Sequence, residues 1–174
     1  MSRLAAFFPD YQAAAVYDLT PEWFRERGFR GLILDIDNTL VSPNAPADEA
    51  ARAWTRRLKE AGLALAVLSN NSRQRAESFA AALDCSFVAE AGKPRPEGFM
   101  RAMEMLETDR QSTLVIGDQL LTDVFGAHRA GLKCLLVDAL DPAREQPFVR
   151  VKRLLEKPIR LAYEKAKRNK EKNS

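Results

Sequence analysis

Short apolar runs alternate with helical patterns along most of the chain, and this alternation constrains the fold more than any other feature. The apolar runs are residues 31–36, 63–69, 86–89, 113–117 and 132–137. The helical patterns between them cover about 48–61, 72–83, 96–107 and 120–130. Strands that alternate with helices predict a parallel sheet with right-handed crossovers. Because the runs are apolar throughout, helices are expected on both faces, which gives a three-layer, Rossmann-like α/β fold.

Single residues predict where several helices begin and end. Ser72 is a suitable N-cap, and Thr20 followed by Pro21 indicates a helix start before the first strand. Gly62 and Gly131 stand where helices are expected to stop. These signals place the helix ends in the loops that flank the apolar runs.

The 30 residues before the first strand are rich in aromatic side chains, among them Phe7, Phe8, Tyr11 and Tyr17. Two interpretations are open for this segment: it packs on the sheet as a lid, or it presents a surface to a substrate or a membrane. We treat residues 1–30 as an extension of one domain that spans 1–149, a length that suits a single core.

Composition argues against several classes of protein. With His128 as the one histidine, neither a Cys₂His₂ zinc site nor a Ser-His-Asp triad has support, and His128 is predicted to be structural. Cys85 and Cys134 form no CxxC pair, so free thiols are expected, with Cys134 buried. No signal peptide is visible, and no run approaches the ~18 apolar residues of a membrane span. A cytoplasmic location is therefore expected.

Polar side chains follow four of the predicted strands. Asp35 and Asp37 are two residues apart, so they leave the first strand on the same side. Ser69 follows the second strand, Lys93 the third and Asp118 the fourth. The carboxyl ends of strands in an open parallel sheet form the ligand crevice, so these side chains are expected to converge. Isolated buried charge is destabilising, which favours a site that binds a cation and an anionic substrate.

The residue types at these strand ends suit phosphoryl transfer. Asp35 can attack phosphorus and form an aspartyl-phosphate, and Asp37 can serve as general acid and then general base. Lys93 offers positive charge to the phosphate, and Ser69 offers a hydroxyl. Mg²⁺ prefers oxygen ligands, which Asp35, the backbone carbonyl of Asp37 and Asp118 could supply. The pattern thus predicts a catalytic site with Mg²⁺ as cofactor.

Further residues complete the predicted site. Thr39 and Asn70 are predicted to bind phosphate together with Ser69 and Lys93. Asp123 is predicted to orient Lys93 or a metal-bound water.

Three arginines near the predicted phosphate site have open roles. Arg73 and Arg75 begin the helix that follows the second strand, and Arg95 lies close after the third. They either hold a second anionic group of the substrate or are solvated surface charges.

The four motifs resemble those of a known superfamily. Segment 35–40 resembles the DxDxT motif of haloacid dehalogenase-like phosphatases, Ser69 matches their second motif, Lys93 their third and segment 117–123 their fourth. The resemblance covers about residues 5–140. Within subfamily IIIA, segments 68–71, 92–94 and 117–123 resemble the YqeG-type branch, which is similar to phosphatidylglycerophosphate phosphatases. This resemblance implies the haloacid dehalogenase-like fold and transfers the roles above to each matched residue. It also implies phosphatase chemistry, because dehalogenase members lack a second acid at the position of Asp37.

The intervals between motifs leave no room for a cap domain. Asp37 and Ser69 are 32 residues apart, and Ser69 and Lys93 are 24 apart, enough for one helix each. An uncapped site is open and suits a large phosphomonoester. We expect hydrolysis of phosphatidylglycerophosphate at a membrane surface, with a protein, nucleotide or other phosphoester as the alternative substrate.

Residues 150–174 form a basic tail. They hold ten lysines and arginines against three glutamates, a net charge of +7, whereas residues 1–149 hold 17 basic and 21 acidic residues. Interspersed apolar residues are typical of a basic amphipathic helix, which we expect Pro158 to interrupt. Three alternatives are open: peripheral binding to anionic phospholipid at the inner membrane face, RNA or ribosome binding with vestigial catalysis, or a helix packed on the domain. From Lys165 onward we expect fraying.

Overall fold

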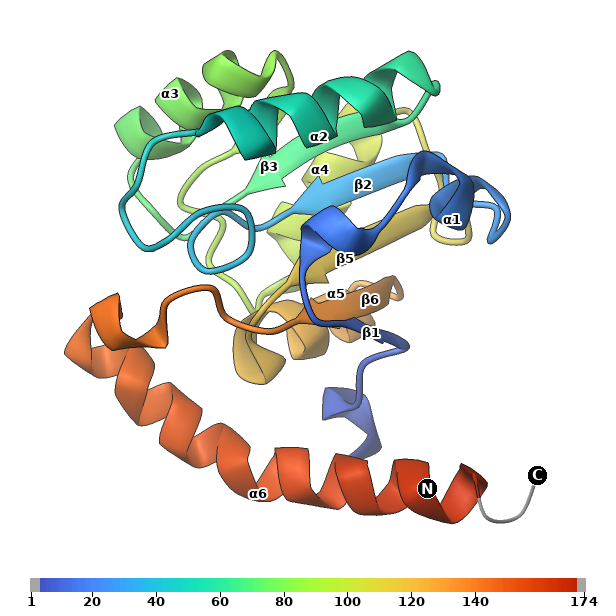
Figure 1. The fold of residues 1–174 in the computed structure, drawn as a ribbon, viewed down its shortest axis with the longest axis vertical. Coiled ribbons are helices and arrows are strands. Elements are labelled where there is room, and N and C mark those ends of the chain that lie inside the picture. The colour runs from blue at the N-terminus through green and yellow to red at the C-terminus, as the bar shows by residue number, and fades with distance from the viewer. Residues whose placement is uncertain (1–3, 172–174) are drawn as a thin grey trace.

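The computed structural model describes residues 4–171, which build one six-stranded sheet between layers of helices (Figure 1). The strands are β1 (Tyr11–Ala13), β2 (Gly31–Leu34), β3 (Ala64–Leu68), β4 (Ser86–Val88), β5 (Thr113–Gly117) and β6 (Lys133–Val137). All neighbours pair in parallel, in the order β1-β6-β5-β2-β3-β4. The chain runs outward from β2 toward one edge and from β5 toward the other, so the switch point of the sheet lies between these two strands.

This sheet confirms the predicted parallel α/β fold. Five strands match the predicted apolar runs to within two residues, and β2 stops at Leu34 because the chain then turns: the carbonyl of Ile36 accepts hydrogen bonds from three backbone N–H groups at 39–41. The sixth strand, β1, was not predicted. It is three residues long and pairs only with β6 at the edge of the sheet, so it carries no apolar run of its own.

Helices cover both faces of the sheet. The first core contains side chains of α1 (Pro21–Arg25), α2 (Glu49–Glu60) and α3 (Arg73–Leu83), and the second contains those of α4 (Pro96–Met105) and α5 (Phe125–Arg129). Each interval between β2 and β4 holds one helix, α2 or α3, which confirms the uncapped architecture. Short helical segments complete the fold: η1 (Ala5–Phe7), η2 (Val16–Asp18), the π-helical η3 (Leu120–Val124) and η4 (Pro142–Arg144).

The predicted helix ends are confirmed. The side chain of Thr20 accepts a hydrogen bond from the first turn of α1 at 3.4 Å, and that of Ser72 accepts one from α3 at 3.5 Å. Gly62 and Gly131 follow α2 and α5 with φ of 85° and 75°, in the left-handed region that favours glycine. The helix predicted over 120–130 is divided, because its first five residues form η3 rather than α-helix.

The aromatic N-terminal segment packs on the domain, which supports the first of its two interpretations. Tyr11 in β1 makes edge-on contacts with Trp23 and Phe29, and Phe7 stacks on Phe125 at 4.5 Å. Val16 is buried in the first core. The segment therefore closes the β6 side of the sheet and covers part of the second core.

The histidine has the structural role predicted for it. The ring nitrogens of His128 lie 2.8 Å from the carbonyl oxygen of Ala6 and 3.0 Å from Oδ2 of Asp10. The hydrogen bond to Asp10 raises the pKa of His128, with burial opposing it. Burial acts to raise the pKa of Asp10, but hydrogen bonds from His128 and from the Cys134 backbone outweigh it and lower that pKa. The pair thus ties α5 to the N-terminal segment.

Stability should fall as the pH rises through the raised pKa of His128. The folded state holds the His128 proton more tightly than the unfolded state, so this contribution is complete below about pH 6.5 and is lost above the folded pKa. The expected loss is about 1 kcal/mol or less, since the pair is partly exposed. Urea unfolding at pH 6 and pH 9 measures it, and His128→Gln should remove the difference; an equal difference in that variant would assign the effect to other groups.

The two cysteines are free thiols, as predicted. Cys134 is buried in β6, and burial raises its thiol pKa well above the ordinary value. Such a thiol is unreactive, so its role is packing.

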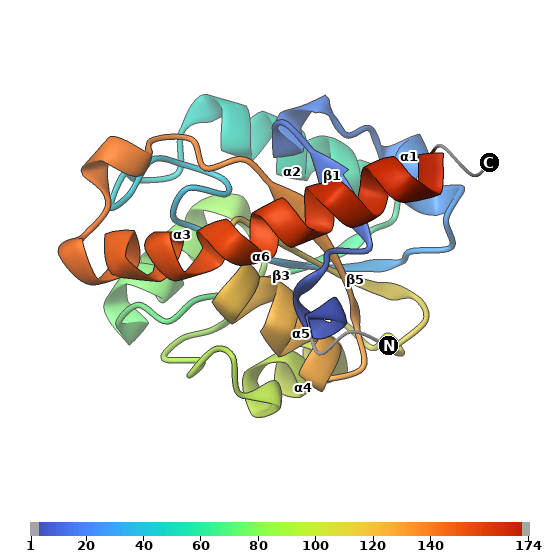
Figure 2. The same cartoon turned by 90° about the horizontal axis from the view of Figure 1, so that it is seen from below.

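The predicted tail is one long helix, α6 (Pro147–Glu171), which crosses one side of the domain (Figure 2). Two expectations were wrong. Pro158 does not interrupt the helix, because it lies on the exposed side while Glu156 and Ile159 are buried against the domain on either side of it. The chain also stays helical from Lys165 to Glu171; residues 172–174 lie outside the described part. Among residues 4–171, no helix is both long and apolar enough to cross a bilayer.

Candidate active site

The switch point of the sheet brings the first and fourth motifs together. In the β2–β5 register Leu34 pairs with Ile116, so Asp35 and Asp118 follow the same end of adjacent strands. The backbone N–H of Asp35 donates to Ile116 at 2.9 Å, which fixes the start of the turn. Thr39 then places its hydroxyl 3.2 Å from Asp35 and 3.5 Å from Asp118. Thr39 therefore contacts both carboxylates directly, and its predicted phosphate contact remains a prediction.

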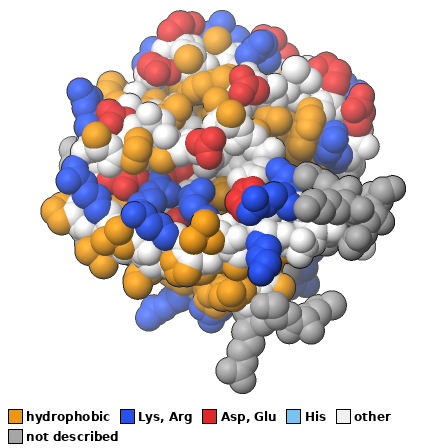
Figure 3. Space-filling model, turned by 60° about the horizontal axis from the view of Figure 1, so that its bottom comes forward, with side chains coloured by type: hydrophobic (Ala, Val, Ile, Leu, Met, Phe, Trp, Pro, Cys, Tyr) orange, Lys and Arg blue, Asp and Glu red, His pale blue; other side chains and the backbone are white. Residues whose placement is uncertain are grey.

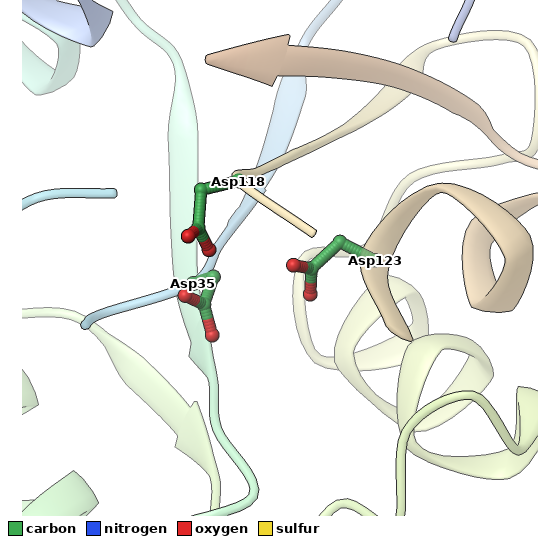
Figure 4. Close-up of side chains that lie close together, drawn as sticks. All are labelled: Asp35, Asp118 and Asp123. Carbon is green, nitrogen blue, oxygen red and sulfur yellow. The ribbon is translucent and has the colours of Figure 1, made fainter. Parts of the chain in front are cut away.

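Three acidic side chains gather at this point (Figure 4). One carboxylate oxygen each of Asp35, Asp118 and Asp123 lie within 4.8 Å of one another. They come from the end of β2, the end of β5 and η3, and they point toward a common centre. Gly117 makes this possible, because a Cβ there would lie 2.4 Å from Cγ of Asp123. A side chain at position 117 would push Asp123 out of the cluster.

Lys93 stands between two of these acids. Its Nζ donates to Asp35 at 2.5 Å and to Asp123 at 2.7 Å, and its side chain is 4% exposed. Burial acts to lower the pKa of Lys93, but Asp123 and Asp35 outweigh it and raise that pKa. Lys93 is therefore a fixed cation, and its contact with Asp123 supports the orienting role predicted for that acid.

Electrostatics suit this cluster to a divalent cation. Burial raises the pKa of Asp35 to about 6, although Lys93 acts to lower it. Burial also raises the pKa of Asp118 well above its ordinary value, against the influence of Arg153. Carboxylates that resist ionisation because they are buried together gain stability when a cation joins them. Oxygen-only donors of this kind fit Mg²⁺.

Asp37 lies apart from that cluster. Its carboxylate accepts hydrogen bonds from Asn71 at 2.6 Å, from Arg75 at 2.9 Å and from the backbone of Asn44 at 2.9 Å. The side chain is thus free of the acidic cluster, as a general acid and base requires, and only its backbone carbonyl remains a predicted metal ligand.

The structure gives different contacts to the three arginines whose roles the sequence left open. Arg75 forms an ion pair with the Asp37 carboxylate, whereas Arg73 pairs with Glu77 on the exposed side of α3 at 3.8 Å. Arg95 is exposed at the start of α4. Arg75 is therefore the one of the three that contacts a predicted catalytic side chain.

Ser69 and Asn70 follow β3 at the same crevice. Ser69 is buried, and its hydroxyl accepts from the backbone of Asn71 at 3.1 Å. The Asn70 side chain bonds the main chain of Lys93 twice, to the N–H at 2.8 Å and to the carbonyl at 3.2 Å. Asn70 thus holds the lysine loop in place, a role that motif reasoning missed.

A pocket opens over these residues, and part of its wall comes from the first turns of α6. Asp35, Asp37, Ser69 and Lys93 line one part of it, and Phe148, Val149 and Lys152 of α6 line another. Arg153 of α6 also reaches the Asp118 carboxylate. The basic character of this segment was visible in the sequence, but nothing there indicated that it reaches the site.

Residues 34–131 match the family of haloacid dehalogenase-like hydrolases, and the chain belongs to this family. Probable phosphatase YqeG of Bacillus subtilis (strain 168) is 39% identical over 132 residues, which cover 75% of this chain and 77% of that protein. Glyceraldehyde 3-phosphate phosphatase of Pyrococcus abyssi (strain GE5 / Orsay) is 28% identical over 92 residues, which cover 48% of this chain and 39% of that protein. The resemblance to the YqeG-type branch is thereby confirmed.

Solved structures agree on the fold. The cobalt-bound deoxy-D-mannose-octulosonate 8-phosphate phosphatase of Haemophilus influenzae has a TM-score of 0.53 at 18% identity, covering 72% of this chain and 75% of that one. NagD from E. coli K-12 has a TM-score of 0.52 at 16% identity, covering 69% and 93%. At such low identity the likeness confirms the haloacid dehalogenase-like fold and nothing finer.

Proposed function

We propose that this protein is a Mg²⁺-dependent phosphomonoester hydrolase that forms an aspartyl-phosphate on Asp35. The observation that supports this most is that residues of all four motifs line one pocket, the fourth motif through Gln119 and Thr122. Lys93 and Asp123 contact each other beside Asp35, and Asp118 joins them from the neighbouring strand. Family membership supports the hydrolase class independently.

In the proposed first step, a carboxylate oxygen of Asp35 bonds to phosphorus while the bond from phosphorus to the ester oxygen breaks. Asp37 gives its proton to the departing alkoxide. In the second step Asp37 takes a proton from water, whose oxygen attacks phosphorus and displaces Asp35, so inorganic phosphate leaves. Lys93 offsets negative charge on the phosphoryl oxygens, and Ser69 offers them a hydroxyl.

Asp35, Asp118 and the Asp37 carbonyl would hold the metal ion. When bound there, Mg²⁺ supplies positive charge next to the phosphate and the attacking carboxylate.

For the substrate, we propose phosphatidylglycerophosphate, reached from the cytoplasmic face of a membrane. The pocket is uncapped, and α6 leads away from it with exposed apolar side chains at Phe148, Val151, Leu154, Leu155 and Leu161. Basic and hydrophobic side chains are interspersed over the face that carries α6 (Figure 3). Such a face suits an anionic lipid surface, and Phe148 and Lys152 continue it into the pocket.

A phosphate-release screen tests the function and the substrate together. The purified protein is assayed with Mg²⁺ on phosphatidylglycerophosphate in mixed micelles and on nucleotides, sugar phosphates and phosphopeptides, with EDTA as the control. Phosphate release that EDTA abolishes is expected, and it should be fastest on the lipid. Faster turnover of a nucleotide or phosphopeptide, with none of the lipid, would reject the lipid and keep the chemistry. No turnover of any class would contradict the hydrolase.

The membrane surface makes a separate prediction. Leu155→Glu should weaken binding to vesicles of phosphatidylglycerol and phosphatidylcholine by about 10-fold or more, because it places a charge where an apolar side chain would be buried. Met105→Glu on α4 changes charge equally at another exposed apolar residue and should bind as the unaltered protein does. Vesicle co-sedimentation measures both. Equal binding by the two variants would contradict the α6 surface, and salt-sensitive RNA binding instead would favour the nucleic-acid alternative.

A further inference from the structure

One arginine of α6 holds both the side chain and the main chain of Asp118. Arg153 donates from Nη2 to Oδ2 of Asp118, and from Nη1 to its carbonyl oxygen at 2.7 Å. Arg160, two turns further along α6, donates to the same carbonyl at 3.2 Å. Asp118 itself is fully buried. The planar guanidinium makes these two bonds from two nitrogens held in a rigid geometry, which a lysine, with its single nitrogen, cannot reproduce.

Arg153 is in turn held by two buried carboxylates. Glu145 accepts from its Nε at 2.9 Å and from its Nη2 at 2.7 Å, and Glu145 also accepts from Asn38 at 2.8 Å. Glu156 lies 3.7 Å from Arg153 and accepts a hydrogen bond from η3 at 3.1 Å. Three carboxylates thus surround one guanidinium, so its charge is offset and its position is fixed.

Asp118 turns different oxygens toward Arg153 and toward the catalytic site. The hydroxyl of Thr39 contacts Oδ2 of Asp35 and Oδ1 of Asp118, so Oδ1 faces Asp35. Oδ2 faces Arg153. The contact with α6 therefore leaves one oxygen of Asp118 directed at the acidic cluster.

We propose that Arg153 is a positioning residue for the metal site, and that it makes divalent-cation binding and the docking of α6 mutually dependent. The proposal rests on the proposed function, because it takes Asp118 as a metal ligand. Arg153 holds Asp118 in the orientation that a cation needs. Its charge opposes the cation little because Glu145 and Glu156 offset it, Glu156 being shared with Arg160 at 3.5 Å. Docked α6 thus strengthens cation binding. By linkage, a bound cation stabilises the docking of α6 by the same free energy.

Calorimetric titration with Mg²⁺ tests whether Arg153 strengthens cation binding. Arg153→Ala should bind Mg²⁺ about 10-fold to 100-fold more weakly than the unaltered protein. Arg153→Lys keeps the charge but not the planar guanidinium with its two donor nitrogens, so its affinity for Mg²⁺ should be intermediate. Arg168→Ala is the matched control, an exposed arginine of the same helix, and should bind normally. Equal or tighter binding by Arg153→Ala overturns the proposal while leaving the metal site intact. No binding by the unaltered protein contradicts the metal site, and with it the proposal.

Hydrogen exchange of the unaltered protein tests whether a bound cation stabilises the docking of α6, and this experiment needs no variant. Amide protons of α6 around 150–160 should exchange more slowly when Mg²⁺ is added, as should those of η3. The amides of α2, which packs in the first core on the other face of the sheet, serve as the internal reference. Faster exchange in α6 with Mg²⁺ would show that Arg153 competes with the cation and would overturn the proposal, as would no change at saturating Mg²⁺.

Discussion

Replacing Asp35 by asparagine should reduce phosphate release by about 10⁴-fold or more, because the amide lacks the nucleophilic carboxylate. The change is nearly isosteric, and the amide oxygen can still accept the hydrogen bond that Lys93 donates at 2.5 Å. The fold should therefore persist, which circular dichroism checks. A continuous phosphate-release assay with the preferred substrate measures the loss.

A control variant and a trapping experiment test whether the loss is specific to Asp35. Asp138→Asn removes an exposed carboxylate just after β6 and should leave turnover unchanged. Rapid acid quenching with radiolabelled substrate should trap phosphate on the unaltered protein and none on Asp35→Asn. Mg²⁺-dependent turnover retained by Asp35→Asn would reject the proposed nucleophile, whatever the substrate proves to be.

The central part of this fold was predictable because local signals and topology agree. In a parallel sheet covered by helices the central strands are buried on both faces, so β2, β3 and β5 are short apolar runs between amphipathic helices. Two elements depend instead on tertiary contacts between parts of the chain that are far apart in sequence. β1 is a strand because its three residues pair with β6, and α6 stays helical across Pro158 because its neighbours on both sides are buried against the domain.

The residues of the candidate site likewise fall into two groups, those that the sequence predicts and those whose positions depend on tertiary packing. Side chains at strand ends must meet, so Asp35, Lys93 and Asp118 could be placed together before any coordinates. Arg75 and Arg153 could not, because their positions depend on how α3 and α6 pack. Both contact predicted catalytic or metal-binding acids, Asp37 and Asp118, across 38 and 35 residues of sequence. No sequence motif or hydrophobic periodicity predicts contacts such as Arg75 with Asp37 or Arg153 with Asp118.

The second large effect is expected from Lys93→Met, which removes the buried cation but nearly keeps the volume. The carboxylates of Asp35 and Asp123 would then be buried without their partner, and removing one member of a buried ion pair destabilises a protein by about 3–5 kcal/mol. Turnover should also fall about 10²-fold to 10³-fold, because a fixed charge beside the phosphate is lost. Urea unfolding and phosphate release measure the two effects.

Lys59→Met is the matched control, since Lys59 also pairs with an aspartate at 2.9 Å, but that partner, Asp84, is 98% exposed. Water already stabilises the charge of Asp84, so the ion pair itself contributes about 1 kcal/mol or less, and turnover should be unchanged. The difference between the two variants measures how strongly burial couples Lys93 to its acids. If Lys93→Met were no less stable than Lys59→Met, the expectation that burial couples Lys93 strongly to Asp35 and Asp123 would be wrong.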